Sequence, residues 1–148
     1  MNPSFLIGLV AGQRAMTPLA VLAGAARDGR LDADAPGVTL LANPLIAAGA
    51  VALAAGEMAG DKMTTAPDRI VPAGLAARLA TSTFAGAVLA APGKRRRGAA
   101  IAAAAAVASS YIGWRLRCAA IKRWGQTATG VVEDAAVLAA GQAIVSRR

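Results

Sequence analysis

Five apolar runs, separated by short charged stretches, constrain this chain more than any other feature of its sequence. A helix needs about 20 mostly apolar residues to cross a bilayer, and each run is close to that length. The stretches between them combine Pro or Gly with charge, which is typical of helix breaks. We therefore predict an all-α, polytopic transmembrane bundle, a single domain over 1–148, with spans at 3–26, 38–60, 72–91, 98–117 and 127–145.

The composition supports this interpretation. Hydrophobic residues make up 56% of the chain and charged residues only 16%, which is too apolar for an ordinary soluble domain. The first run contains Gln13 and Arg14 and has no basic residue before it, so we interpret it as a retained span and not as a cleaved signal peptide.

Several kinds of chemistry are excluded by residue counts. Cys118 is the only cysteine and the chain has no histidine, so an intrachain disulfide, Cys/His zinc ligation and histidine-based catalysis are ruled out within one chain. We expect no metal and no cofactor. The net charge is +8, and the charged residues lie between the apolar runs without the interleaved aromatic residues that stack on bases. We therefore expect the partners to be anionic lipid head groups, bound at Lys94, Arg95, Arg96 and Arg97, and we expect no binding of nucleic acid.

Small residues recur four positions apart in two of the runs, at Gly8 and Gly12 and at Gly56 and Gly60. Such spacing lets helices approach closely, although an alanine-rich sequence also produces it by chance. Run one contains Gly12-Gln13-Arg14 and run four contains the similar Gly113-Trp114-Arg115. Run two likewise has two acidic residues, Glu57 and Asp61, and run five has Glu133 and Asp134. Two such units separated by one span would form an inverted repeat, as in many transporters; coincidence is the alternative.

Charged residues inside the runs converge on one half of the bilayer if the chain crosses five times. Arg14 lies roughly 16 Å past Pro3, and Glu57, Arg78 and Asp134 each lie roughly 8–10 Å inside the side that holds the N-terminus. Embedded charges usually face the bundle interior and pair with one another. We predict that Arg14 is paired with Glu57, Asp61, Glu133 or Asp134. There are two alternatives: water at the interface solvates Glu57 and Asp61, or the side chain of Arg78 extends along its stem to the surface.

Pro18 removes a backbone donor and disfavours helical geometry at Thr17. Run one is therefore predicted to kink just past Arg14 and to free carbonyl groups there, a device that transporters use to bind ions; a kink that only serves packing is the alternative. More basic residues lie on the side of the C-terminus than on the side of the N-terminus. This predicts a cytoplasmic C-terminus and an external N-terminus in the bacterial inner membrane. Insertion in both orientations is the alternative.

Four motifs resemble those of a known family: "GLVAGQRAMTPLAV", "GEMAGDKM", "APDRIVPAGLAARLATSTFAGA" and "VEDAAVLAAG". The chain resembles, over nearly its whole length, the small bacterial membrane proteins of domain-of-unknown-function family 4126. The motif residues fall on Gly12, Arg14, Thr17 and Pro18, on Glu57, Gly60, Asp61 and Lys62, and on Pro67 and Arg69. The resemblance implies an integral membrane protein and supplies no activity.

Three functions remain open. The first is a transporter or channel for a small anionic solute, and the second is a non-catalytic scaffold or accessory subunit that binds lipid or a partner protein. The third, an enzyme acting on lipid, would have only carboxylates to work with, so we expect no enzyme. We expect a homo-oligomer, because thin helices enclose little space alone. The candidate solute site comprises Arg14, Thr17, Glu57, Asp61, Lys62, Arg69, Arg78, Glu133 and Asp134.

Overall fold

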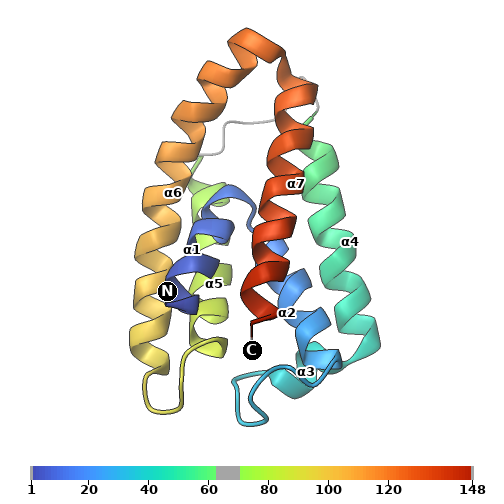
Figure 1. The fold of residues 1–148 in the computed structure, drawn as a ribbon, viewed down its shortest axis with the longest axis vertical. Helices are drawn as coiled ribbons and strands as arrows, with labels where there is room; N and C mark the ends of the chain where they lie inside the picture. The colour runs from blue at the N-terminus through green and yellow to red at the C-terminus, as the bar shows by residue number, and fades with distance from the viewer. Residues whose placement is uncertain (1, 63–70, 148) are drawn as a thin grey trace.

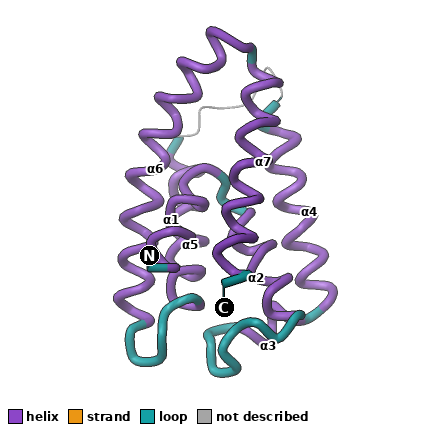
Figure 2. The backbone as a smooth tube through the Cα atoms, viewed as in Figure 1, coloured by secondary structure: helices purple, strands orange, loops and turns teal. Residues whose placement is uncertain are grey.

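The structure, a computed structural model, describes residues 2–62 and 71–147. The described residues form seven α-helices and no strand, which confirms the all-α prediction (Figures 1 and 2). The helices are α1 (Pro3–Gln13), α2 (Thr17–Arg27), α3 (Val38–Ala42), α4 (Pro44–Gly60), α5 (Pro72–Val88), α6 (Arg95–Trp124) and α7 (Gln126–Val145).

The first apolar run was predicted to be one span with a kink just past Arg14. The chain does break there, but the run is two helices that reverse direction. α1 ends where the backbone of Arg14 becomes extended (φ −140°, ψ 116°), and α2 starts three residues later with Pro18 in its first turn. α1 runs parallel to α6, since Gly8 lies beside Ala105 and Gly12 beside Ala106. α2 returns toward the starting end, so α1 and α2 form a hairpin with Arg14 at its tip (Figure 1).

Two other boundaries differ from the predicted ones. The second run breaks at Asn43, whose side chain accepts a hydrogen bond from the amide of Leu45 and so starts α4. The predicted break at 115–126 is mostly helix, because α6 continues to Trp124. The chain then turns at Gly125, whose φ of 82° suits a residue without a Cβ.

Both chain ends lie at the same end of the bundle (Figure 1). We call it the lower end; it also holds the 28–37 loop and the 89–94 turn, and Asp34 of the loop forms an ion pair with Arg95, the first residue of α6 (2.8 Å). The opposite, upper end holds the end of α4 and the turn between α6 and α7. The N-terminus was predicted on the side nearer to Glu57 and Asp134, and this placement is corrected because the α1–α2 hairpin adds a reversal that the five-crossing count lacks.

Helix α1 packs closely against α6, as the Gly8 and Gly12 spacing predicted. A Cβ on Gly12 would lie 2.5 Å from the carbonyl oxygen of Ala106, so only glycine permits this approach. Gly56 and Gly60 behave differently, since a Cβ on either would meet nothing within 4 Å. The first small-residue pair is therefore a packing face, and the second is not.

Among the described helices, α6 and α7 are long and apolar enough to cross a membrane, and α1 and α4 are shorter apolar helices. Two such helices support membrane insertion weakly. The two similar tripeptides on which the inverted repeat was based differ in backbone conformation. The chain breaks at Gly12–Arg14, whereas Gly113–Arg115 lies inside the continuous helix α6.

Candidate functional site

The helix break at the tip of the α1–α2 hairpin leaves backbone N–H groups that need acceptors. Residues before the first turn of α2 cannot bond within that helix, and buried N–H groups without partners are costly. Glu57 of α4 supplies both acceptors: its Oε1 lies 2.8 Å from the amide nitrogen of Ala15, and its Oε2 lies 2.8 Å from that of Met16. One carboxylate therefore spans two successive N–H groups at the amino end of α2.

The side chain of Arg14 is almost completely buried, with 1% of its surface exposed. Its Nη2 lies 2.7 Å from Oδ2 of Asp61, at the end of α4. Its Nε donates a hydrogen bond to Oδ1 of Asp134, in the third turn of α7, at 2.8 Å. The predicted pairing of Arg14 is confirmed, with Asp61 and Asp134 as its two partners.

Two more cations complete the network around these carboxylates. Arg117 of α6 is 8% exposed and lies 2.6 Å from Asp61 and 2.9 Å from Glu133. Lys62 forms an ion pair with Asp134 and donates a hydrogen bond to the carbonyl oxygen of Met58 at 3.0 Å. We call Arg14, Glu57, Asp61, Lys62, Arg117, Glu133 and Asp134 the charged cluster.

The charged cluster joins four parts of the fold, namely the hairpin tip, α4, α6 and α7, near the upper end of the bundle. Three cations face three carboxylates in ion pairs, and the fourth carboxylate, Glu57, lies on the backbone amides. The positive end of the α2 dipole faces Glu57, which stabilises its negative charge. The cluster is thus balanced by side chains and by one helix end together.

The remaining predicted residues lie elsewhere or in other roles. Arg78 is buried in α5, and none of the ion pairs above involves it. Thr17 is fully buried beside the hairpin tip, and its hydroxyl oxygen has no hydrogen-bond partner among the described residues. Arg69 lies outside the described residues. The basic residues Lys94, Arg95, Arg96 and Arg97 lie at the lower end, away from the cluster.

The predicted use of the kink is corrected. We expected carbonyl groups to be freed after Arg14, whereas the groups that the break presents to Glu57 are the N–H groups of Ala15 and Met16. The reason is the hairpin: the bond of the Arg14 amide to the carbonyl of Val10 ends α1, and the next two amides precede the first turn of α2. Glu57 therefore binds backbone N–H groups, and the carboxylates that neutralise Arg14 are those of Asp61 and Asp134.

Sequence reasoning missed Arg117, which we had placed at the end of a span. A signal was present, because it extends a row of small buried residues in α6, spaced three or four apart. The row continues the face that packs against α1 and contains Ala102, Ala106, Ser109, Gly113 and Arg117. A residue on that face points inward, so an arginine there requires partners.

No group of three or more Asp, Glu, Cys or His side chains among the described residues is arranged to hold a metal ion. The side chains of the charged cluster form ion pairs, and two backbone amides bind the carboxylate of Glu57. Comparison of the chain with family models, with curated proteins and with solved structures finds no match. The resemblance to family 4126 stays a prediction.

Proposed function

We propose that the protein is an integral membrane protein in which α4, α5, α6 and α7 cross the bilayer. The α1–α2 hairpin then enters and leaves from the lower end. Large apolar side chains are exposed on three of these helices, for example Leu45, Leu53, Tyr111 and Val131 at 47–81% exposure. Contiguous exposed apolar surface is rare on soluble monomers. α4 and α5, with 17 residues each, are at the short limit for a span.

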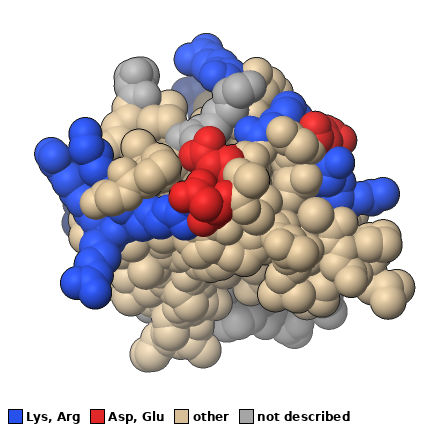
Figure 3. Space-filling model, turned by 90° about the horizontal axis from the view of Figure 1, so that it is seen from below, with Lys and Arg blue, Asp and Glu red and all other residues tan. Residues whose placement is uncertain are grey.

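The charge distribution supports a cytoplasmic lower end, in the inner membrane of a bacterium. Figure 3 looks onto this end and shows Lys and Arg side chains around its edge. The cluster cations Lys62 and Arg117 are paired with carboxylates and do not add to the charge of the upper surface. At the lower end Arg30 and Arg95 are paired with carboxylates as well, so the bias toward that end is the one that the count of basic residues gives. Positive loops prefer the cytoplasm. Both termini would then be cytoplasmic.

Within this class, we propose that the protein transports a small anion and has no enzymatic activity. The observation that supports it is the carboxylate of Glu57 bound to the amides of Ala15 and Met16. Broken helices whose amino ends face an anionic group are how many transporters hold substrate. Here an internal carboxylate occupies that position, and a solute anion would compete with it for the same two N–H groups. The buried hydroxyl of Thr17 is a further donor at this helix end.

The other charges hold this site in place. Nε and Nη2 of Arg14 are bound to Asp134 and Asp61, so we assign Arg14 a positioning role. Asp61 follows Glu57 by four residues, so both lie on one face of α4. The Arg14–Asp61 pair therefore fixes the end of α4 beside the hairpin tip, and the side chain of Glu57 can leave the amides while α4 stays.

Anion uptake into proteoliposomes tests this function, with chloride, acetate and phosphate as the probes. We expect saturable uptake above that of protein-free liposomes for at least one of them. Glu57→Gln removes the competing charge while keeping the size of the side chain, so the concentration for half-maximal uptake should fall by about tenfold, the equivalent of one 1.4 kcal/mol interaction. Glu133→Gln is the matched control, because Glu133 contacts Arg117 and not the hairpin amides. Uptake equal to that of empty liposomes for all three anions rejects the proposal.

A structural scaffold or accessory subunit is the second candidate, and the burial of Arg14 favours it. An arginine that is 1% exposed and paired with two carboxylates is sufficient to fix helix register without any solute. This candidate predicts stable co-purification with one partner protein and no anion uptake. The two candidates thus give opposite results in the same liposomes.

A further inference from the structure

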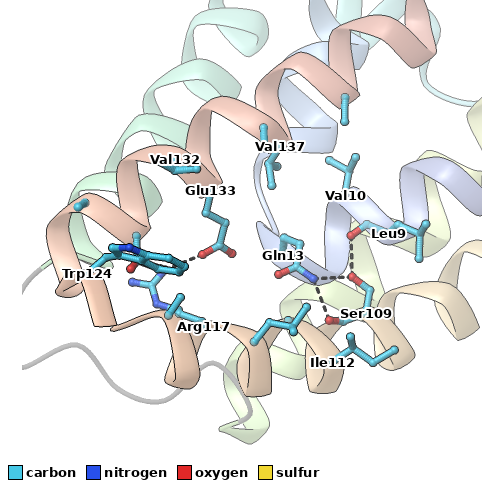
Figure 4. A pocket seen from close by; sticks show the side chains of 17 residues that line it. Leu9, Val10, Gln13, Ser109, Ile112, Arg117, Trp124, Val132, Glu133 and Val137 are labelled. Atoms are coloured by element: carbon cyan, nitrogen blue, oxygen red, sulfur yellow. Dashed lines mark hydrogen bonds and ion pairs between the residues drawn. The ribbon is translucent and has the colours of Figure 1, made fainter. Parts of the chain in front are cut away.

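An apolar cleft of about 870 Å³ lies between α6 and α7, with α1 at its base (Figure 4). The two helices meet at Gly125 and diverge toward the lower end, which leaves this space between them (Figure 1). Hydrophobic side chains dominate the lining, among them Leu9, Val10, Ile112, Leu116, Val132 and Val137. The anion site proposed above does not use this cleft.

The polar side chains at the cleft already have partners within the protein. Gln13 donates hydrogen bonds to the carbonyl oxygen of Ser109 at 2.8 Å and to its hydroxyl at 2.7 Å. Arg117 is paired with Glu133, as Figure 4 shows. An occupant therefore has to be apolar over most of its length, since polar groups entering the cleft would lose hydration without finding new partners.

The apolar lining of the cleft is long enough for the hydrocarbon chains of a lipid. On α6 it runs from Ser109 to Trp124, which corresponds to roughly 22 Å at 1.5 Å per residue. One leaflet contributes about 15 Å to the hydrocarbon core of a bilayer, so an acyl chain can lie along this lining.

The upper end of the cleft carries the groups expected at a lipid head group. Trp124 lines the cleft there, and the guanidinium carbon of Arg123 lies 5.4 Å from the centre of its ring. Arg123 is exposed, and it forms no ion pair with a described residue. Tryptophan prefers the membrane interface, and basic residues near the surface attract acidic lipids.

We infer that this cleft binds one acidic phospholipid. Its two acyl chains lie between α6 and α7, and its phosphate lies near Arg123. The inference depends on the membrane placement proposed above, and it does not depend on anion transport. The site also differs from the basic residues at the lower end, because it combines a chain-sized cleft with its own cationic rim.

Tryptophan quenching by brominated lipids tests this site in detergent solution, where no transport occurs. The probe is phosphatidylglycerol with acyl chains brominated near their carbonyl ends, and the comparison lipid is phosphatidylcholine brominated in the same way. Trp114→Phe leaves Trp124 as the only tryptophan, and Trp124→Phe leaves Trp114, which does not line the cleft. We expect Trp124 to be quenched in a saturable manner at one lipid per protein, and Trp114 much less.

Two sets of variants separate the chains from the head group. Ala136→Leu fills the cleft and should abolish the saturable quenching, whereas Ala139→Leu, on a residue of α7 that does not line it, should leave quenching intact. Arg123→Gln should weaken phosphatidylglycerol binding by about fivefold, with little effect on phosphatidylcholine.

Three results would overturn the inference. Quenching that rises linearly without saturation means that lipid only surrounds the protein. Equal affinity for the two lipids contradicts the assigned head group. A dimer in native mass spectrometry that Ala136→Leu dissociates, without saturable quenching, identifies a second copy of the chain as the occupant.

Discussion

Replacing Arg14 by alanine tests directly how the hairpin tip is held. The guanidinium is 1% exposed and lies 2.7 Å from Asp61 and 2.6 Å from Asp134. Removing one member of a buried ion pair costs about 3–5 kcal/mol, because the remaining charge stays buried without its partner. Both carboxylates keep one cation here, since Asp61 also contacts Arg117 and Asp134 also contacts Lys62.

We therefore expect Arg14→Ala to lower the free energy of unfolding by about 3 kcal/mol, the low end of that range. Arg14→Lys should have a smaller effect, because an ammonium group keeps the charge but lacks the planar fork that reaches two carboxylates. Arg30→Ala is the control, since Arg30 and its partner Asp28 are 29% and 59% exposed and such pairs contribute about 0–1 kcal/mol.

The measurement is reversible unfolding in mixed detergent micelles, followed by tryptophan fluorescence, for the three variants and the parent protein. A loss below about 1 kcal/mol for Arg14→Ala, indistinguishable from that of Arg30→Ala, would show that the charged cluster behaves as an exposed network. The burial argument, and with it the positioning role of Arg14, would then be refuted.

Further predictions concern topology and packing. In a protein with Cys118→Ser, single cysteines placed at Asn2 and at Arg147 should both react with an impermeant maleimide from the same face of oriented vesicles; labelling from opposite faces would restore a five-crossing topology. Gly12→Val should lower the thermal midpoint by several degrees, because a Cβ there would meet the backbone of α6, and a folded variant of unchanged stability would contradict this packing. Gly49→Ala, where a Cβ meets nothing, should raise the free energy of unfolding by about 0.5–1 kcal/mol, and a decrease would show that this face is covered.

The sequence by itself determined that the chain is helical and much of the membership of the charged cluster. Pro3, Pro18, Pro44 and Pro72 each stand in the first turn of a helix, where a missing N–H is harmless. Because burying an unpaired charge is costly, a deep Arg14 required carboxylate partners wherever the helices ran. Local chemistry was sufficient for these conclusions.

Only the tertiary structure decided the direction of the first run and the role of each acidic residue. A run of 24 residues can be one crossing or a hairpin of two short helices, and its apolar composition is the same in both. The choice depends on acceptors for the amides at the break, and Glu57 provides them from more than forty residues away. The backbone of α6 takes part too, since Gly8 and Gly12 lie directly against that helix. The glycine spacing indicates a close helix contact but not the helix that makes it, and nothing near Arg14 indicates Glu57. Each contact depends on which distant segment comes to lie alongside.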